Sequence, residues 1–120
     1  MGKFVISKTP TGCRFSLHAA NGEIVATSEV YSTAAACEKG IQGVRKCAHS
    51  APETDLTGEA ALPANPRFEI FSDKAGSFRF RLRARNGKII LAGQPYSTIA
   101  ACRKGIESVR KNGQTDEIWR

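Results

Sequence analysis

Apolar and polar residues alternate with a period of two in two stretches that lie 65 residues apart. Residues 13–19 read CRFSLHA and residues 78–84 read FRFRLRA. This period predicts strands with one buried face. The segments FVIS (4–7) and FEIF (68–71) predict a strand before each of them, and the segments 23–28 and 88–93 predict a strand after each. The same three strands are therefore expected twice.

The second and third predicted strands of each set are joined by an Asn-Gly pair, Asn21-Gly22 and Asn86-Gly87. A two-residue type I′ turn requires positive φ at both central residues, and Asn and Gly tolerate it. The sequence therefore predicts a two-residue type I′ hairpin in both places.

A helical period follows each hairpin. Residues 31–46 read YSTAAACEKGIQGVRK, and residues 96–111 read YSTIAACRKGIESVRK. Ser32 or Thr33, and Ser97 or Thr98, are candidate N-caps. At 3.6-residue spacing one helix face collects apolar and small residues, namely Ala34, Cys37, Gly40, Ile41, Val44 and Ala48. Gly40 and its counterpart Gly105 are expected to let the helices approach the sheet closely. TDEIW (115–119) and, more weakly, ETDL (53–56) predict a last short strand.

The two sets are copies of one unit. At an offset of 65, residues 14–46 match residues 79–111 at 19 of 33 positions. One such unit would bury little surface and leave open sheet edges. We therefore expect an α+β fold of two tandem β-β-β-α-β repeats, sharing one antiparallel sheet with the helices on one face. Residues 1–51 and 67–120 form the units of one compact pseudo-twofold domain, and 52–66 form a linker with a possible short strand.

The paired hairpins and helices resemble the YegP-like family of small bacterial proteins of uncharacterised function. The resemblance is carried by RFSLHAANGEIVATSEVY and RFRLRARNGKIILAGQPY, followed by EKGIQGVRK and RKGIESVRKN. It implies that the last strands are exchanged between the units, and that relatives with a single unit reach the same form as homodimers. It implies no catalytic residue.

Charge is unevenly distributed along the chain. The net charge is +7, with +3 in residues 1–51, −3 in 52–66 and +7 in 67–120. A basic surface attracts polyanions, although many small proteins are basic without a specific partner. The chain has no apolar run of about 20 residues and no apolar signal segment. We expect a cytoplasmic protein with no membrane contact, and a monomer, because the two units already pair.

The most distinctive segment is FRFRLRAR, residues 78–85. Its arginines, Arg79, Arg81, Arg83 and Arg85, alternate with apolar residues and are expected on the sheet face away from the helices. Lys88 is expected opposite Arg85 across the hairpin. Guanidinium groups in a row suit phosphate contacts, but an ordinary solvated face would look the same. No aromatic residue is expected among the arginines, so no stacking of bases is predicted there.

No catalytic set stands out. Cys37 and Cys102 lie on the predicted apolar helix faces, where a thiol is buried, has a raised pKa and is inert. Cys13 and Cys47 lie near element ends. His18 and His49 are expected at the surface, and neither a metal site nor a cofactor site is indicated.

Two classes of function remain open. One is a non-enzymatic module that binds a polyanion, such as nucleic acid, through the basic sheet face. The other is a protein-interaction or structural accessory module with no role on nucleic acids. The sequence identifies no individual partner.

Overall fold

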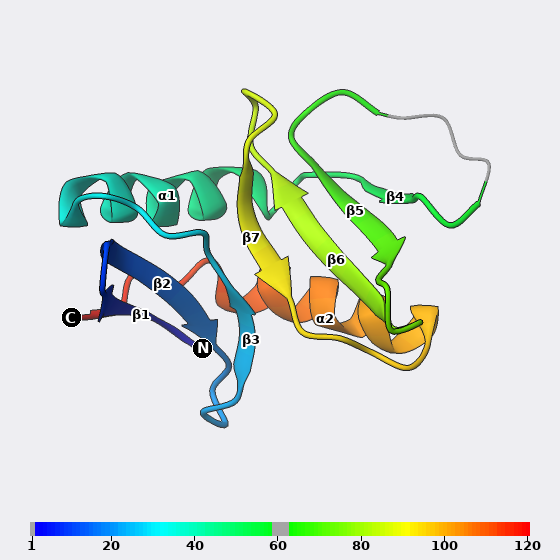
Figure 1. Cartoon of the computed structure of the whole chain (residues 1–120), viewed down its shortest axis with the longest axis horizontal. Helices are drawn as coiled ribbons and strands as arrows, with labels where there is room; N and C mark the ends of the chain where they lie inside the picture. The colour runs from blue at the N-terminus through cyan, green and yellow to red at the C-terminus, as the bar shows by residue number, and fades with distance from the viewer. Residues whose placement is uncertain (1, 59–62) are drawn as a thin grey trace.

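The computed structural model describes residues 2–58 and 63–120, and these residues contain the predicted β-β-β-α-β order twice (Figure 1). Residues 59–62, in the middle of the predicted linker, lie outside the described residues. The elements of the first unit are β1 (Lys3–Thr9), β2 (Gly12–His18), β3 (Ile24–Thr27), α1 (Ala34–Cys47) and β4 (Glu53–Asp55). Those of the second are β5 (Arg67–Ser72), β6 (Phe78–Arg83), β7 (Ile89–Gly93), α2 (Ile99–Asn112) and β8 (Ile118–Trp119).

All eight of these strands form one sheet, in the order β4-β5-β6-β7-β3-β2-β1-β8. The units meet at its centre, where β3 and β7 run antiparallel and Ala26 pairs with Gly93. The short last strands are exchanged: β4 pairs with β5 of the second unit, and β8 with β1 of the first. Each unit therefore supplies the edge strand of the other.

The sheet is mixed, and the expectation of a wholly antiparallel sheet was wrong at its two edges. The β4–β5 and β1–β8 pairs are parallel. Each last strand is reached through a helix rather than a hairpin, so the connection does not impose the antiparallel direction that a hairpin imposes.

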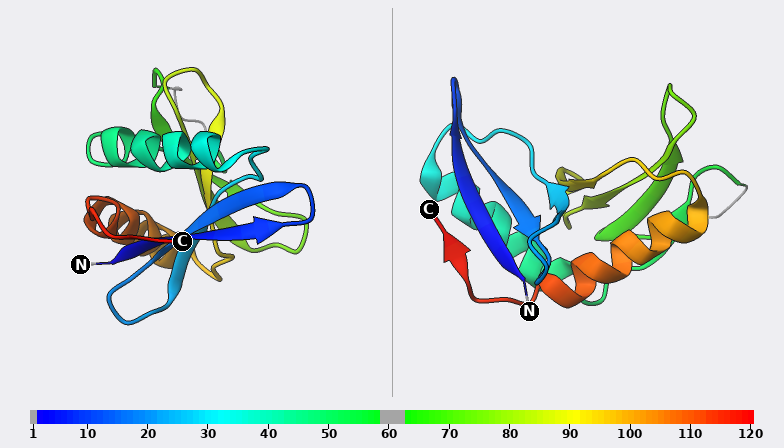
Figure 2. Two further views of the ribbon diagram at one scale, coloured as in Figure 1. Left: turned by 90° about the vertical axis from the view of Figure 1, so that its left-hand side faces the viewer. Right: turned by 90° about the horizontal axis from the view of Figure 1, so that it is seen from below.

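Both helices lie on one face of the sheet, as predicted (Figure 2). The threonine, not the serine, caps each of them: Thr33 and Thr98 accept hydrogen bonds from the backbone N–H groups of Ala36 and Ala101. The predicted inner face of α1 is buried at Cys37, Gly40, Ile41 and Val44. Ala34 is exposed because the first residue of a helix has helical neighbours on one side only.

The core is built from matching pairs of side chains. Phe4, Phe15 and Leu17 of the first unit are fully buried, as are their counterparts Phe68, Phe80 and Leu82. The opposite face of the sheet, called the outer face below, has no helix over it in the part of the chain that the structure describes (Figure 2). Side chains on that face, which the strand period directs away from the core, are therefore available to a partner.

The hairpins differ from the predicted type I′ form. No residue other than glycine has positive φ among the described residues, so Asn21 and Asn86 are in ordinary conformations. In each of these two turns the glycine is the left-handed residue, with φ 87° at Gly22 and 84° at Gly87. In the second hairpin the Gly87 N–H donates to the carbonyl of Ala84, and the Ala84 N–H donates to that of Lys88. This is a type I turn followed by a glycine bulge. The turn therefore begins at Ala84.

Candidate functional site

The predicted arginine strand is β6, and it ends at Arg83, so only three of the four arginines lie on it. Phe80 and Leu82 are fully buried in the core, while Arg79, Arg81 and Arg83 alternate with them on the outer face and are partly buried. Arg85 falls in the hairpin turn instead. It does not pair with Lys88, whose carbonyl accepts from Ala84. Both Arg85 and Lys88 are exposed.

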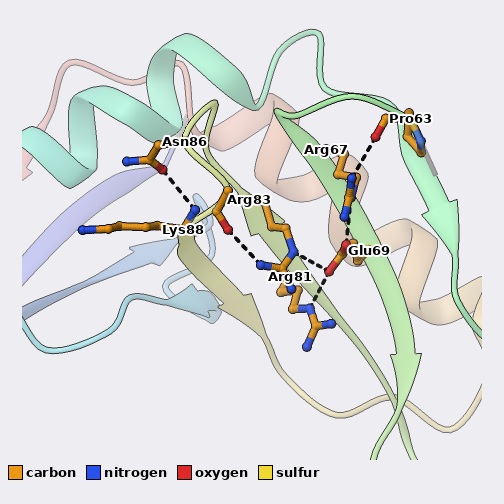
Figure 3. A network of polar contacts seen from close by, with 8 residues as sticks. Pro63, Arg67, Glu69, Arg81, Arg83, Asn86 and Lys88 are labelled. Carbon is orange, nitrogen blue, oxygen red and sulfur yellow. Dashed lines mark hydrogen bonds and ion pairs between the residues drawn. The ribbon is translucent and has the colours of Figure 1, made fainter.

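Three arginines converge on one buried carboxylate, that of Glu69 on β5 (Figure 3). The Nε atoms of Arg81 and Arg83 donate to its Oε1 at 2.7 and 2.8 Å. The Nε of Arg67 donates to Oε2 at 2.8 Å. Glu69 is 2% exposed, because the guanidinium groups cover it. We call Arg67, Arg79, Arg81, Arg83 and Glu69 the arginine face.

Backbone carbonyls also hold three of the four arginine side chains of this face. Arg83 Nη1 donates to the carbonyl of Gly87 at 2.8 Å, and Arg67 Nη1 donates to that of Pro63 at 2.8 Å. Arg79 donates to the carbonyl of Gly93 through Nε and Nη2, at 3.2 and 2.9 Å. These guanidinium groups are therefore held in fixed positions rather than moving freely in solvent.

The ionisation of Glu69 reflects two opposing effects. Burial raises the pKa of its carboxyl, but the hydrogen bonds from Arg81, Arg83 and Arg67 outweigh burial and lower it to about 2. Glu69 is thus ionised at neutral pH, and its single negative charge balances one of the three arginine charges that contact it. The arginine face keeps a positive surplus.

An aromatic ring also lies in this face, so the expectation that it contains none was wrong. Phe71, the next outward residue after Glu69 on β5, lies under Arg81, whose Cζ is 4.5 Å from the ring centroid. Arg67, Glu69 and Phe71 were not among the predicted residues of this face. The period-two pattern of RFEIFS, continued along β5, would have placed all three outward.

The first unit lacks the charge cluster at the matching positions. Val5, Ser16 and His18 stand there in place of Glu69, Arg81 and Arg83. One element of the geometry is retained, because a ring nitrogen of His18 lies 3.3 Å from the carbonyl oxygen of Gly22, as Arg83 bonds that of Gly87. The other ring nitrogen lies 3.0 Å from the Ser16 hydroxyl. The cluster is therefore not needed to build the unit.

The helix cysteines are packing residues. Cys37 and Cys102 are fully buried, and burial raises the pKa of each thiol to about 11. The predicted burial of these two thiols and their predicted raised pKa are confirmed. Cys13 and Cys47 are partly exposed free thiols. Within residues 2–58 and 63–120, no group of three or more His, Cys, Asp or Glu side chains is arranged to hold a metal ion.

The repeat is recognised in known proteins. The model of the family described as "Domain of unknown function (DUF1508)" matches twice, at residues 11–55 and 73–119. The chain belongs to this family. The first match in this DUF1508 chain extends through β4, so the exchanged strand is part of the conserved unit as the family defines it.

Relatives and solved structures agree with this assignment. The DUF1508 chain is 35% identical to the UPF0339 protein YegP of Escherichia coli K12, covering 98% of this chain and 94% of that protein. It is 39% identical to a UPF0339 protein of Photorhabdus laumondii, covering 87% and 79%. The solution structure of YegP from E. coli superimposes with a TM-score of 0.79 at 34% identity, covering 98% and 90%. The suspected family and the fold are thus confirmed. The family description assigns no activity.

A shorter relative bears on the architecture. A UPF0339 protein of Treponema denticola is 56% identical over 46 residues, which are 79% of its length but 38% of this chain. That protein therefore has room for about one unit. A single unit with an exchanged last strand needs a second copy to complete its sheet edge.

The two helices were also compared with the requirements for a membrane-spanning helix. In the part of the chain that the structure describes, neither helix has the length and apolar character needed to cross a membrane.

Proposed function

We propose that this protein is a non-enzymatic module that binds a polyanion, with nucleic acid as the fitting class, through the arginine face. The observation that carries the proposal is the arrangement around Glu69. Three guanidinium groups, those of Arg67, Arg81 and Arg83, are fixed by hydrogen bonds to one carboxylate. The guanidinium group of Arg79 is fixed by a backbone carbonyl. Groups fixed in this way lose little conformational freedom when they contact phosphates.

Two further cations extend the positive surface. Arg85 and Lys88, at the tip of the β6–β7 hairpin, are exposed and form no ion pair within the described residues. The first unit has Ala20 and Glu23 at these positions. The second unit therefore presents the stronger positive potential, in line with the charge asymmetry of the sequence.

The test must leave Glu69 paired. Removing Arg81 or Arg83 would strip a buried carboxylate of its partners and confuse binding with folding. We therefore choose Arg85→Gln together with Lys88→Gln, and measure fluorescence anisotropy of labelled DNA and RNA over a range of salt concentrations. The expected result is weaker binding to all sequences alike, with the slope of log K against log salt reduced by about 1.4 to 1.8.

The matched control removes two charges from helix α2 instead of from the β6–β7 hairpin. Lys104 and Lys111 are exposed residues on α2. The variant with Gln at both positions has the same net charge as the test variant, and it should keep most of the wild-type slope. If the wild type shows no binding at low salt, the polyanion proposal is wrong and the protein-interaction alternative takes its place.

A further inference from the structure

Two aromatic side chains occupy the outer face, one on the edge strand β8 and one on β5, the second strand from the opposite edge. Trp119 on the edge strand β8 pairs with Val5 of β1, next to the fully buried Phe4, so Val5 and Trp119 point away from the core. Phe71 on β5 follows the fully buried Ile70 and points the same way. The same uncovered face thus carries a ring in each half of the pseudo-twofold domain.

A positively charged side chain lies over each of these rings. Lys3 Nζ lies 3.6 Å from the ring centroid of Trp119, and Arg81 Cζ lies 4.5 Å from that of Phe71. Trp119 is nevertheless 53% exposed, the highest value among the large apolar side chains that the structure describes as exposed. An exposed indole on an uncovered basic sheet offers a flat apolar surface next to positive charge.

We infer that the outer face binds single-stranded rather than double-stranded nucleic acid, with bases stacked on Trp119 and on the Arg81–Phe71 pair. This inference rests on the proposed polyanion function and adds the form of the nucleic acid. Unpaired bases stack on aromatic rings and on guanidinium planes, while the bases of a duplex are already stacked on each other. The rings therefore add affinity for a single strand alone.

The two stacking positions differ in how they receive a base. Arg81 is fixed by Glu69, so its guanidinium plane stays on Phe71 and a base stacks on the arginine. Lys3 has a flexible stem and no ion pair within the described residues. A cation over an exposed ring is held more weakly than a stacked base, so a base displaces Lys3 from Trp119 and frees it to contact a phosphate.

The experiment compares two probes on the full chain. One is a labelled single strand of about 16 nucleotides, the upper end of site sizes for one single-strand-binding domain, and the other is a blunt duplex of the same length. Anisotropy measures binding, and the fluorescence of Trp119, the sole tryptophan, reports stacking directly. The expected result is tighter binding of the single strand and quenching by the single strand alone.

Substitutions of the two aromatic residues test the contribution of the rings to binding separately from that of the charged side chains. Trp119→Leu and Phe71→Leu should each weaken single-strand binding about tenfold and leave duplex binding unchanged. Trp119→Phe keeps a ring and should restore most of the affinity. Val30→Ser is the control, because Val30 is 47% exposed but lies between β3 and α1 rather than on an outer strand. Thermal unfolding of each variant checks that the fold is retained.

The possible outcomes distinguish failure of the stacking inference from failure of the proposed polyanion binding. Equal binding of single strand and duplex, without a change in Trp119 fluorescence, would overturn the stacking inference and leave polyanion binding standing. Binding of neither probe at low salt would overturn both. Selective single-strand binding that survives in Trp119→Leu and Phe71→Leu would also overturn the stacking inference, because the rings would then contribute nothing.

Discussion

The hydroxyl group of Tyr96 occupies the space that a side chain at Gly105 would need. A Cβ placed on Gly105 would lie 2.8 Å from Tyr96 Cζ and 2.9 Å from Phe80 Cε2. The first unit repeats this arrangement, with Tyr31 and Phe15 against Gly40. The glycines thus accommodate a tyrosine ring between helix and sheet, where it stacks on the phenylalanine with centroids 6.4 Å apart in the second unit.

Gly105→Ala should destabilise the protein although alanine favours helices. The alanine gains about 1 kcal/mol of helix propensity, but the new methyl group overlaps the tyrosine, and overpacking of this kind costs about 1–3 kcal/mol. We expect a net loss, measured as the free energy of unfolding in urea. Gly43→Ala is the control, since its Cβ would lie an ordinary 3.6 Å from Ile90 Cδ1. It should stabilise α1 by about 0.5–1 kcal/mol. Equal gains at both sites would contradict the role given to Tyr96.

Glu69 should make the free energy of unfolding depend on pH in the acidic range. Its pKa is lowered from 4.5 to about 2 in the folded protein. The ionised carboxylate therefore stabilises the fold above about pH 4.5, and this contribution, at most about 3 kcal/mol, is lost as the pH falls toward 2. Urea unfolding of the wild type and of Glu69→Gln should give stabilities that differ most near neutral pH and converge in acid. Glu23→Gln, at an exposed glutamate of the first hairpin, should follow the wild-type profile. Parallel profiles for wild type and Glu69→Gln would show that the arginines do not stabilise the carboxylate.

The two classes of thiol should react at different rates. Cys37 and Cys102 are fully buried with pKa values of about 11, so both access and thiolate formation oppose their modification. In the native protein a thiol reagent should label Cys13 and Cys47 first, with the helix cysteines labelled only on unfolding. Mass spectrometry of peptides after short exposure measures this, and the protein in urea, where all four label, is the control. Rapid native labelling of Cys37 or Cys102 would contradict the packing.

Separating the units should not separate the protein. Each unit supplies the other's edge strand, since β4 pairs with β5 and β8 pairs with β1. Two chains, residues 1–58 and 63–120, should therefore form a one-to-one complex when produced together, and each should fold poorly alone. Light scattering gives the stoichiometry, and the intact chain, expected to be a monomer, is the reference. Two independently folded monomeric halves would contradict the shared core.

The sequence alone determined the order of elements, the buried faces and the repeat. Alternation in residues 13–19 and 78–84 and the 3.6-residue period of the helices depend on local geometry, which the chain carries in its own spacing. The burial of Phe15, Phe80, Cys37 and Cys102 follows from that spacing. The N-cap of each helix was predicted to be one of two adjacent residues, a serine or a threonine, because capping also depends on local sequence.

Tertiary structure decided what depends on pairing between strands. Phe71 and Glu69 stand far from Arg81 in sequence, and only the β5–β6 register brings them under it. That register turned an apparent row of free arginines into a network around one carboxylate, with an aromatic ring beneath it. The parallel edges and the glycine bulge at Gly87 were likewise decided by packing of the whole sheet, because strand direction and hairpin twist depend on neighbours that a local pattern does not contain.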